Sequence, residues 1–305
     1  MQAGPIAGIL AAQHPAGYWD HPGPGYTPKF RGTVWQLMFL DQLGADGNDP
    51  RIRAACEYVL EHTQTTSGGF GSWSGTAQRL AAPPPSTVIH CLNGNLLRAL
   101  LGFGWTDDPR VQAAIEWEAH AITGAPPIRY SRGRGTTGPG FACGSNDGQP
   151  CAWGAIKALL ALARVPGRLR SPLVQQAIEQ GAAFLLSCDP ATAAYPTGYG
   201  NTQPSRSWFK LGFPSGGFVA DVLQNLEALA ELGYAGDDRL RPALTWLLSK
   251  HDAQGRWTNE LAYTGKTWVD IDRQGAPSKW VTLRACRVLK LAESAADRAR
   301  KPPRR

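Results

Sequence analysis

Two kinds of helical pattern alternate along the chain. Segments of the first kind are amphipathic, with apolar residues recurring at every third or fourth position. These segments are residues 4–13, 49–63, 107–121, 170–187 and 237–251. Several of them open with a residue that commonly caps a helix, such as Asp49 or Ser171. The pattern predicts helices with one face toward the core and one toward solvent.

Segments of the second kind are apolar on most sides, as is typical of helices that other helices surround. These segments are residues 31–44, 86–104, 150–165, 215–233 and 278–293. No alternation of the kind found in strands is long enough to compete with either pattern. The alternation predicts an all-α protein of about five hairpins, each with an outer and an inner helix.

A short motif stands at the end of three amphipathic segments. Its frame is a polar residue, three residues, glycine, one residue and an aromatic residue, as in QHPAGYW (13–19), QTTSGGF (64–70) and HDAQGRW (251–257). Glycine ends a helix readily, and a Gln side chain can bind backbone groups that the helix end leaves unpaired. We therefore expect a structural clasp between successive hairpins, with Trp19 and Trp257 buried beneath the loops.

QHPAGYW and HDAQGRW resemble the QW repeats of the terpenoid cyclase and protein prenyltransferase superfamily. GTVWQLMFLDQLG, CLNGNLLRALLGFG, WFKLGFP and GAPSKWVTLRACRVLK resemble parts of small bacterial prenyltransferase-like or squalene-cyclase-like repeat proteins. The resemblance covers nearly the whole chain. It implies an α/α toroid over residues 1–294, in which outer helices enclose a ring of inner helices. Residues 295–305 would then form a basic tail, which we expect to be flexible.

Connections from outer to inner helices would all lie at one end of such a ring. They are long here, and they cover residues 20–30, 71–85, 122–149, 188–214 and 258–277. Long loops in a compact domain commonly carry function. Together with the inner helices they supply the candidate substrate-binding residues Trp35, Asn95, Arg129, Arg132, Trp153, Trp208 and Lys210. We expect the aromatic residues to line a central cavity and the basic ones to bind a diphosphate head group.

Asp221 is the candidate catalytic acid. The cyclases that the chain resembles protonate an alkene with a D-x-D-D motif, and the nearest stretch here is DIDR (270–273), which ends in Arg273. That departure speaks against cyclisation of the squalene type. Asp221 lies near the start of an inner helix among apolar residues, where burial and cationic neighbours would tune its pKa.

Three cysteines are candidate zinc ligands. Cys143 and Cys151 flank GSNDGQP, and Cys91 stands at the start of the preceding inner helix. Thiolates suit zinc, but the spacing between Cys143 and Cys151 is not that of a standard finger. The Asp-x-Cys motif of the resembled prenyltransferases does not occur in the chain. A zinc site and buried structural thiols therefore both remain open, and zinc is the one cofactor that the sequence suggests.

Composition limits the partners of the protein. The chain has 305 residues, of which 43% are hydrophobic and 18% charged, as in a globular protein. Its formal net charge is +7, and residues 296–305 hold five Lys or Arg against one Asp, so little positive charge is left for nucleic acid. No apolar stretch reaches the ~20 residues that span a membrane. The start of the chain lacks a basic leader, so we expect a cytoplasmic protein.

The leading hypothesis is a terpenoid cyclase-like or prenyltransferase-like protein that holds a hydrophobic, isoprenoid-like molecule in the toroid cavity. Neither its reaction nor its oligomeric state follows from the sequence, because a fold alone does not determine chemistry. One alternative is a toroid that binds or scaffolds without catalysis. A second alternative is zinc-dependent thiol alkylation, that is, prenyl transfer to a thiol.

Overall fold

Helices make up the framework of the protein. The computed structural model describes residues 4–71, 88–126, 137–215 and 217–300. The helices are α1 (Pro5–Ala11), α2 (Thr33–Gln42), α3 (Pro50–His62), α4 (His90–Gly102), α5 (Pro109–Thr123), α6 (Ala152–Leu162), α7 (Pro172–Leu185), α8 (Val222–Leu229), α9 (Arg241–Leu248) and α10 (Lys279–Arg300). Within the described ranges, extended segments pair only through isolated bridges, and no strand forms. The predicted all-α class is confirmed.

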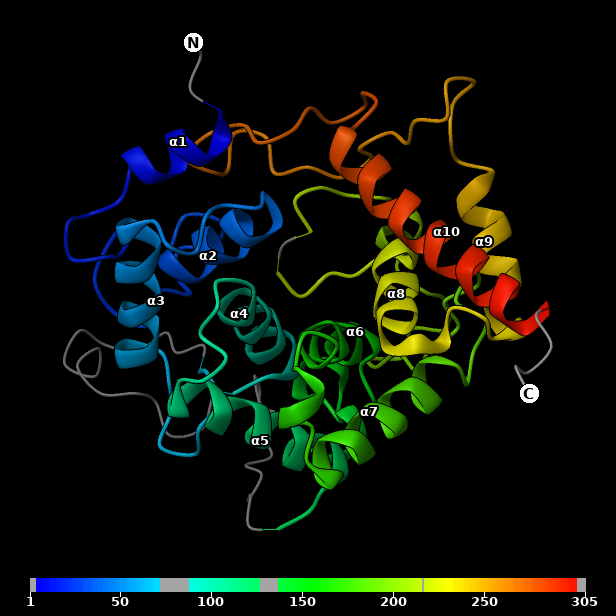
Figure 1. Ribbon diagram of the computed structural model, residues 1–305, viewed down its shortest axis with the longest axis horizontal. Coiled ribbons are helices and arrows are strands. Elements are labelled where there is room, and N and C mark those ends of the chain that lie inside the picture. The colour runs from blue at the N-terminus through cyan, green and yellow to red at the C-terminus, as the bar shows by residue number, and fades with distance from the viewer. Residues whose placement is uncertain (1–3, 72–87, 127–136, 216, 301–305) are drawn as a thin grey trace.

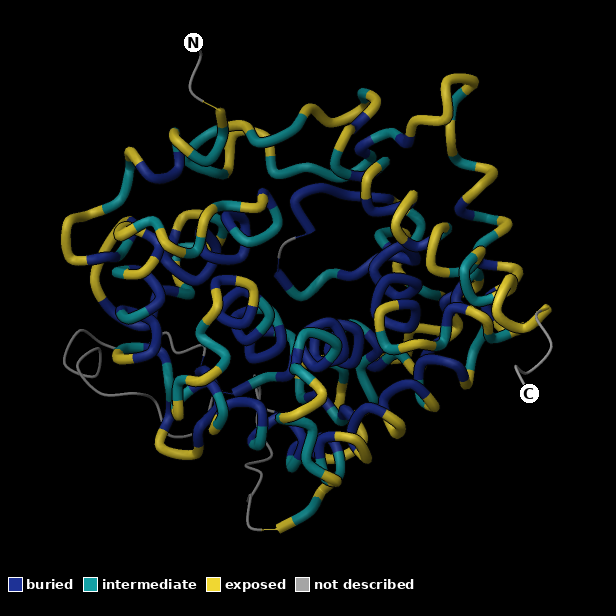
Figure 2. The backbone as a smooth tube through the Cα atoms, in the orientation of Figure 1, coloured by how far each residue is buried: buried dark blue, intermediate teal, exposed yellow. Residues whose placement is uncertain are grey.

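The helices that were expected to be inner pack on one another in chain order. Helix α2 packs on α4, α4 on α6, α6 on α8, and α8 on α10. Helices α3, α5, α7 and α9 lie outside this series, as Figure 1 shows. Figure 2 shows that these two groups of helices also differ in burial. The outer helices expose one side, whereas α4 and α6 are largely buried. Helix α10 differs from its prediction as an inner helix, because it buries Val281, Arg284, Ala285 and Val288 but exposes Leu283 and Leu291 on its other side.

A glycine allows the closest of these helix contacts. A Cβ atom added to Gly94 in α4 would lie 2.5 Å from the carbonyl carbon and oxygen of Lys157 in α6. That distance is shorter than atoms can approach without moving the backbone of one helix. Gly94 therefore lets α4 and α6 pack backbone to backbone, although glycine lowers helix propensity.

Asp49, Asp108 and Ser171 begin the outer helices α3, α5 and α7, and Asp237 begins the short 3-10 helix Asp238–Leu240 that leads into α9. Asp49, Asp108 and Asp237 each accept a hydrogen bond from the backbone N–H two residues later. Ser171 accepts one from Val174 N at 3.3 Å. Side-chain oxygens at these positions satisfy N–H groups that the first helical turn leaves unpaired, which confirms the expected starts.

The two glutamines of the clasp motif connect the end of α1 to α3 and the end of α3 to α5. The Gln13 amide donates to Gly17 O at 3.3 Å and to Arg51 O at 2.8 Å, in the first turn of α3. The Gln64 amide donates in the same way to Gly68 O at 2.7 Å and to Arg110 O at 2.6 Å, in the first turn of α5. The predicted structural role of this motif is confirmed.

The aromatic residues of the clasps are buried, as expected. Trp19 is 0% and Trp257 is 3% exposed. Their indole N–H groups donate to Ile9 O and to Leu247 O, each at 2.8 Å. Each tryptophan therefore binds a carbonyl near the end of the helix that precedes it, where carbonyls lack helical partners.

The predicted inner helix at residues 215–233 starts later than expected. Helix α8 begins at Val222, and the segment before it runs in an irregular path between α2, α4 and α8 (Figure 1). Ser215 N and its hydroxyl donate to Gln42 Oε1 of α2, each at 2.8 Å, and Asn95 of α4 donates to Gly217 O at 2.7 Å. Residues 211–215 and 217–220 thus fill much of the space where the sequence predicted a cavity.

The last helix extends into the segment that was predicted to be a basic tail. Helix α10 continues to Arg300, and residues 301–305 lie outside the described residues. Among the described residues, no helix combines the length and the apolar character that crossing a membrane requires.

Candidate functional site

The predicted site residues lie in three separate places. Trp153, Trp208 and Cys151 line a large cavity of about 480 Å³. Lys210 and Asp221 line one hollow of about 10 Å³, and Trp35, Cys91 and Asn95 line another of about 10 Å³. A hollow of that size holds about one water molecule. Arg129 and Arg132 lie outside the described residues.

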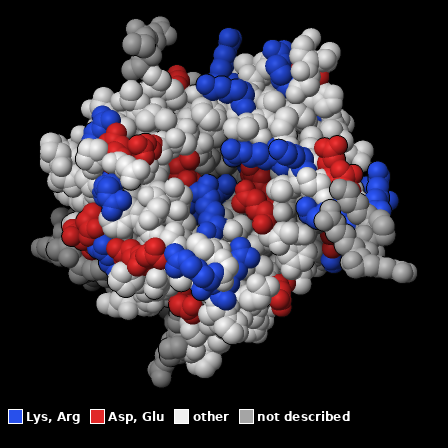
Figure 3. All heavy atoms as spheres, viewed as in Figure 1, with Lys and Arg blue, Asp and Glu red and all other residues white. Residues whose placement is uncertain are grey.

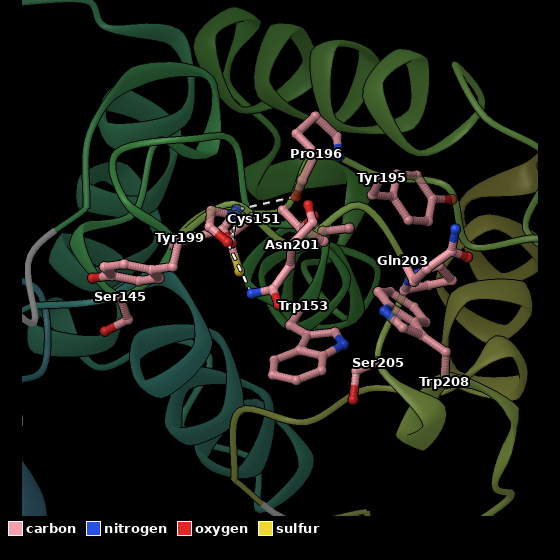
Figure 4. Close-up of a pocket in the computed structure, with 15 residues that line it drawn as sticks. Ser145, Cys151, Trp153, Tyr195, Pro196, Tyr199, Asn201, Gln203, Ser205 and Trp208 are labelled. Atoms are coloured by element: carbon pink, nitrogen blue, oxygen red, sulfur yellow. Dashed lines mark hydrogen bonds between the residues drawn. The ribbon is translucent and has the colours of Figure 1, made fainter.

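Four aromatic side chains surround the large cavity. Trp153 comes from the first turn of α6, and Tyr195, Tyr199 and Trp208 come from the segment between α7 and α8 (Figure 4). The ring centroids of Trp153 and Trp208 are 6.1 Å apart, and those of Tyr195 and Trp208 are 5.4 Å apart. Tilted rings at these separations attract one another, so the aromatic wall is packed in place.

Tyr195 is held firmly at the back of this wall. Its hydroxyl donates to Leu185 O at 2.7 Å and accepts from the Asn225 amide at 2.8 Å. Burial raises the pKa of Tyr195 above the usual value of a phenol. The hydroxyl therefore stays protonated and acts as a structural link between the end of α7 and α8.

The polar side chains that line the cavity are uncharged. They are Ser145, Asn146, Cys151, Thr197, Asn201, Gln203 and Ser205. None of the described residues around the cavity is a Lys, Arg, Asp, Glu or His. The indole nitrogen of Trp153 is buried without a hydrogen-bond partner, and an unpaired buried donor costs stability.

One loop carries a wall of the cavity. The Asn146 amide donates to Pro196 O at 3.1 Å, and its Oδ1 accepts from Gly198 N at 3.0 Å. The Tyr199 hydroxyl donates to Gly144 O at 3.1 Å. Residues 144–147 and 196–199 therefore move as one unit, because separating them would break several hydrogen bonds.

Cys143 and Cys151 lie at the two ends of this loop. Cys143 N donates to Gln149 O at 3.1 Å, and Cys151 N donates to Phe141 O at 2.9 Å. A hydrogen bond from the Cys151 thiol lowers the pKa of Cys143 to about 6, and the same contact raises the pKa of Cys151. Cys143 is therefore the sulfur that ionises first.

The third predicted zinc ligand is nearby but differs from this pair. Burial raises the pKa of Cys91 to about 12. Within the described part of the chain, which includes all six cysteines, no three His, Cys, Asp or Glu side chains are placed to hold a metal ion. Zinc binding by Cys91, Cys143 and Cys151 stays a prediction without support from the geometry.

Asp221 begins helix α8. Its Oδ1 accepts from Gln224 N at 2.8 Å, its Oδ2 accepts from Gly212 N at 3.2 Å, and the residue is 3% exposed. Burial raises the pKa of this carboxyl group. Both oxygens accept hydrogen bonds from backbone N–H groups, and Asp221 does not line the large cavity. The catalytic role of Asp221 stays a prediction, while its capping role is evident.

Sequence reasoning missed a buried lysine next to Asp221. Lys157 in α6 is 2% exposed, and its Nζ donates to the Gln224 side chain of α8. Burial lowers the pKa of Lys157 to about 7, although Asp221 opposes the change. The sequence itself marks this lysine, because Lys157 is the one charged residue in the apolar run 152–162.

Stability should rise with pH above neutrality because of Lys157. The unfolded chain keeps this amine protonated up to its ordinary pKa, whereas the folded protein releases the proton near pH 7. Between these values the unfolded state binds more protons, so each pH unit adds up to about 1.4 kcal/mol to the free energy of unfolding. Urea unfolding at several pH values should show this slope reduced in Lys157→Met. It should be unchanged in Lys290→Met, which alters an exposed lysine.

A second buried network joins α4 to α5. His90 Nδ1 lies 2.5 Å from Glu118 Oε1, and the Asn93 amide donates to Glu118 Oε2 at 2.5 Å. Burial alone would lower the pKa of His90, but the Glu118 carboxylate raises it above its usual value. Phe70 N of the second clasp donates to Asn93 Oδ1 at 2.9 Å. The network therefore fixes a clasp to the helix pair beneath it.

The large cavity beside Trp153 and Trp208 is the candidate functional site. The space-filling view shows charged side chains gathered in the middle of one face (Figure 3), whereas the cavity lining itself is neutral. No model of a known protein family matches the chain, and no curated protein matches it.

Proposed function

We propose that the protein is a terpenoid cyclase-like α/α toroid that binds an isoprenoid-like molecule with an uncharged polar head. The observation that carries this proposal is a cavity of about 480 Å³ with four aromatic walls and a neutral lining. Ligand pockets commonly have volumes of about 300–1,000 Å³ and an apolar lining with a few polar groups. The reaction is left unassigned.

The arrangement of the helices supports the toroid part of the proposal. Five helices pack on one another in chain order, from α2 to α10, and four lie outside them. Beyond this series, Trp268 donates to Arg31 O at 2.9 Å, and Phe30 stacks on Tyr263 with centroids 4.3 Å apart. These contacts bring the segment before α10 against the segment before α2, which is how a ring closes.

The neutral lining argues for an alcohol or carbonyl head group. A diphosphate buried in this cavity would have no cation beside it among the described lining residues, and burying an unpaired charge is costly. Lys210 lines a different hollow, so it does not supply that charge. A neutral oxygen, by contrast, could form hydrogen bonds with the uncharged lining side chains Asn201, Gln203 and Ser205. The proposal therefore departs from the diphosphate that the sequence suggested.

A binding protein without catalytic activity is the second candidate. Its support is that the cavity lining has no acid, and that the hollow beside Asp221 measures about 10 Å³. An isoprenoid chain cannot enter a space of that size to reach Asp221, and the described residues that line the large cavity include no carboxylic acid that could protonate an alkene. Prenyl transfer to a thiol is the third candidate, and the zinc content of the purified protein tests it.

Farnesol should bind more tightly than farnesyl diphosphate. Farnesol should raise the melting temperature by mass action, and titration calorimetry should give its Kd. Trp208→Ala should weaken farnesol binding by at least about tenfold, because large aromatic contacts dominate small-molecule sites. The control is Trp246→Ala, which removes a half-buried indole on α9 away from the cavity.

Two results would contradict the proposal. Tighter binding of the diphosphate would show that a charged site holds the head group. If neither ligand shifts the melting temperature while circular dichroism shows an intact helical fold, the isoprenoid proposal fails and the scaffold candidate remains.

A further inference from the structure

Cys143 and Cys151 form a thiol pair that the proposed function does not use. Ala142 and Pro150 face each other in an antiparallel bridge, and the two cysteines flank this pair in the sequence. Side chains alternate between the two faces of extended backbone, so both sulfurs lie on the face opposite Ala142 and Pro150. The backbone hydrogen bonds of both cysteines hold this register, and one thiol donates to the other sulfur.

No other cysteine pair in the protein is arranged in this way. All six cysteines lie among the described residues, and all are free. Cys188 donates to Ala194 O at 3.3 Å, Cys56 is fully buried, and Cys286 is exposed on α10. Cys91 interacts electrostatically with Cys143 and Cys151 but has no side-chain hydrogen bond to either. Among the described residues, the hydrogen bond between two sulfurs is therefore specific to Cys143 and Cys151.

We propose that Cys143 and Cys151 form a redox-active dithiol, which a peroxide oxidises to an intramolecular disulfide and a thiol reductant restores. The Cys143 thiolate attacks one peroxide oxygen, the O–O bond breaks, and sulfenic acid and water form. The Cys151 sulfur then attacks the sulfenic sulfur, and its proton leaves with the hydroxyl group as water. The two thiols lose two electrons and two protons, and hydrogen peroxide becomes two waters.

The disulfide would change the cavity, because the loop between the cysteines carries one of its walls. Cys151 lines the cavity itself. Asn146 inside the loop binds Pro196 and Gly198, and a Cβ atom on Gly198 would lie 2.5 Å from Asn146 O. Such tight packing transmits a shift of the loop to the wall. This second part of the inference rests on the proposed ligand site, whereas the formation of the disulfide does not.

Peptide mapping of the full chain tests the first part. Reduced protein is treated with hydrogen peroxide, free thiols are blocked with N-ethylmaleimide, and peptides are identified by mass spectrometry. We expect a Cys143–Cys151 disulfide peptide that disappears after dithiothreitol. Cys143→Ser and Cys151→Ser should abolish it, and Cys286→Ser should leave it unchanged. Circular dichroism checks that each variant is folded.

Three outcomes would overturn the dithiol. The first is that both thiols remain free to react after oxidation, and the second is that either cysteine pairs with a different one. The third is one equivalent of bound zinc that protects both thiols, which would make them metal ligands. Elemental analysis of protein purified without chelators distinguishes this third outcome from the other two.

Farnesol affinity in the two redox states tests the second part. We expect Kd to change by at least about fivefold on oxidation, near the lower end of typical coupling between two sites. The change should be absent in Cys151→Ser. Equal affinity in both states of a protein that has formed the disulfide would refute the coupling. If farnesol binds neither state, the proposed function fails, and the disulfide is judged by the peptide map alone.

Discussion

Replacing Trp257 with alanine should lower the free energy of unfolding by about 3–5 kcal/mol, the range for large core truncations. The side chain is 3% exposed, and its indole N–H donates to Leu247 O at the end of α9. Its backbone N donates to Thr282 Oγ1 at 3.0 Å, and its carbonyl accepts from Ser278 N at 2.8 Å. Trp257 therefore connects α9 with the start of α10, and alanine would leave a cavity at that junction.

Urea unfolding followed by circular dichroism measures this loss. Trp257→Phe is the matched variant, because it keeps most of the buried ring and removes the hydrogen bond to Leu247 O, which costs about 1 kcal/mol. Arg256→Ala is the surface control, since solvent screens its exposed ion pair with Asp252 and little stability is lost with it. Unchanged stability of folded Trp257→Ala would show that the clasp does not support the core.

Replacing Glu227 with alanine should cost about 3–5 kcal/mol, because it leaves a buried guanidinium without its partner. Glu227 in α8 is 5% and Arg284 in α10 is 8% exposed. Arg284 Nε donates to Glu227 Oε1 at 2.8 Å, a second N–H of the guanidinium donates to Oε2, and Nη1 donates to Gly212 O at 3.1 Å. The pair thus joins α8, α10 and the segment that fills the centre.

The charge state of Glu227 adds a dependence on pH. Burial alone would raise the pKa of this carboxyl group, but Arg284 holds it below its usual value. A carboxyl pKa that is lower in the folded state stabilises the protein above the ordinary pKa of glutamate. That contribution is lost as the pH falls through the folded value. The stability difference between the wild type and Glu227→Ala should therefore be constant near neutrality and shrink in acid.

A double variant distinguishes a lost ion pair from lost packing. Glu227→Leu with Arg284→Met removes both charges and keeps apolar volume, so it should recover most of the stability that Glu227→Ala loses. The measurement is again urea unfolding at neutral pH. A double variant as unstable as Glu227→Ala would mean that packing around Glu227, and not the unpaired charge, explains the loss.

The candidate site was harder to predict than the helices. Trp153 and Trp208 were expected to share a cavity, and both line the large one. Asp221, Asn95 and Trp35 were assigned to the same cavity because they lie on helices that were expected to face the centre. The segment before α8 occupies much of that space, and it was read as part of a helix. Its apolar residues are buried in an irregular path, and composition alone cannot distinguish this from burial in a helix.

The sequence by itself determined the all-α class, the places of most helices along the chain, several helix caps and the buried clasps. These features depend on periodicity and on residues a few positions apart, as Gln13 and Gly17 show. Only the tertiary structure decided where a ligand could bind and which side chains meet there. Lys157 and Gln224, and Glu227 and Arg284, meet because distant segments fold together. Such contacts arise from packing in three dimensions, which local sequence patterns do not encode.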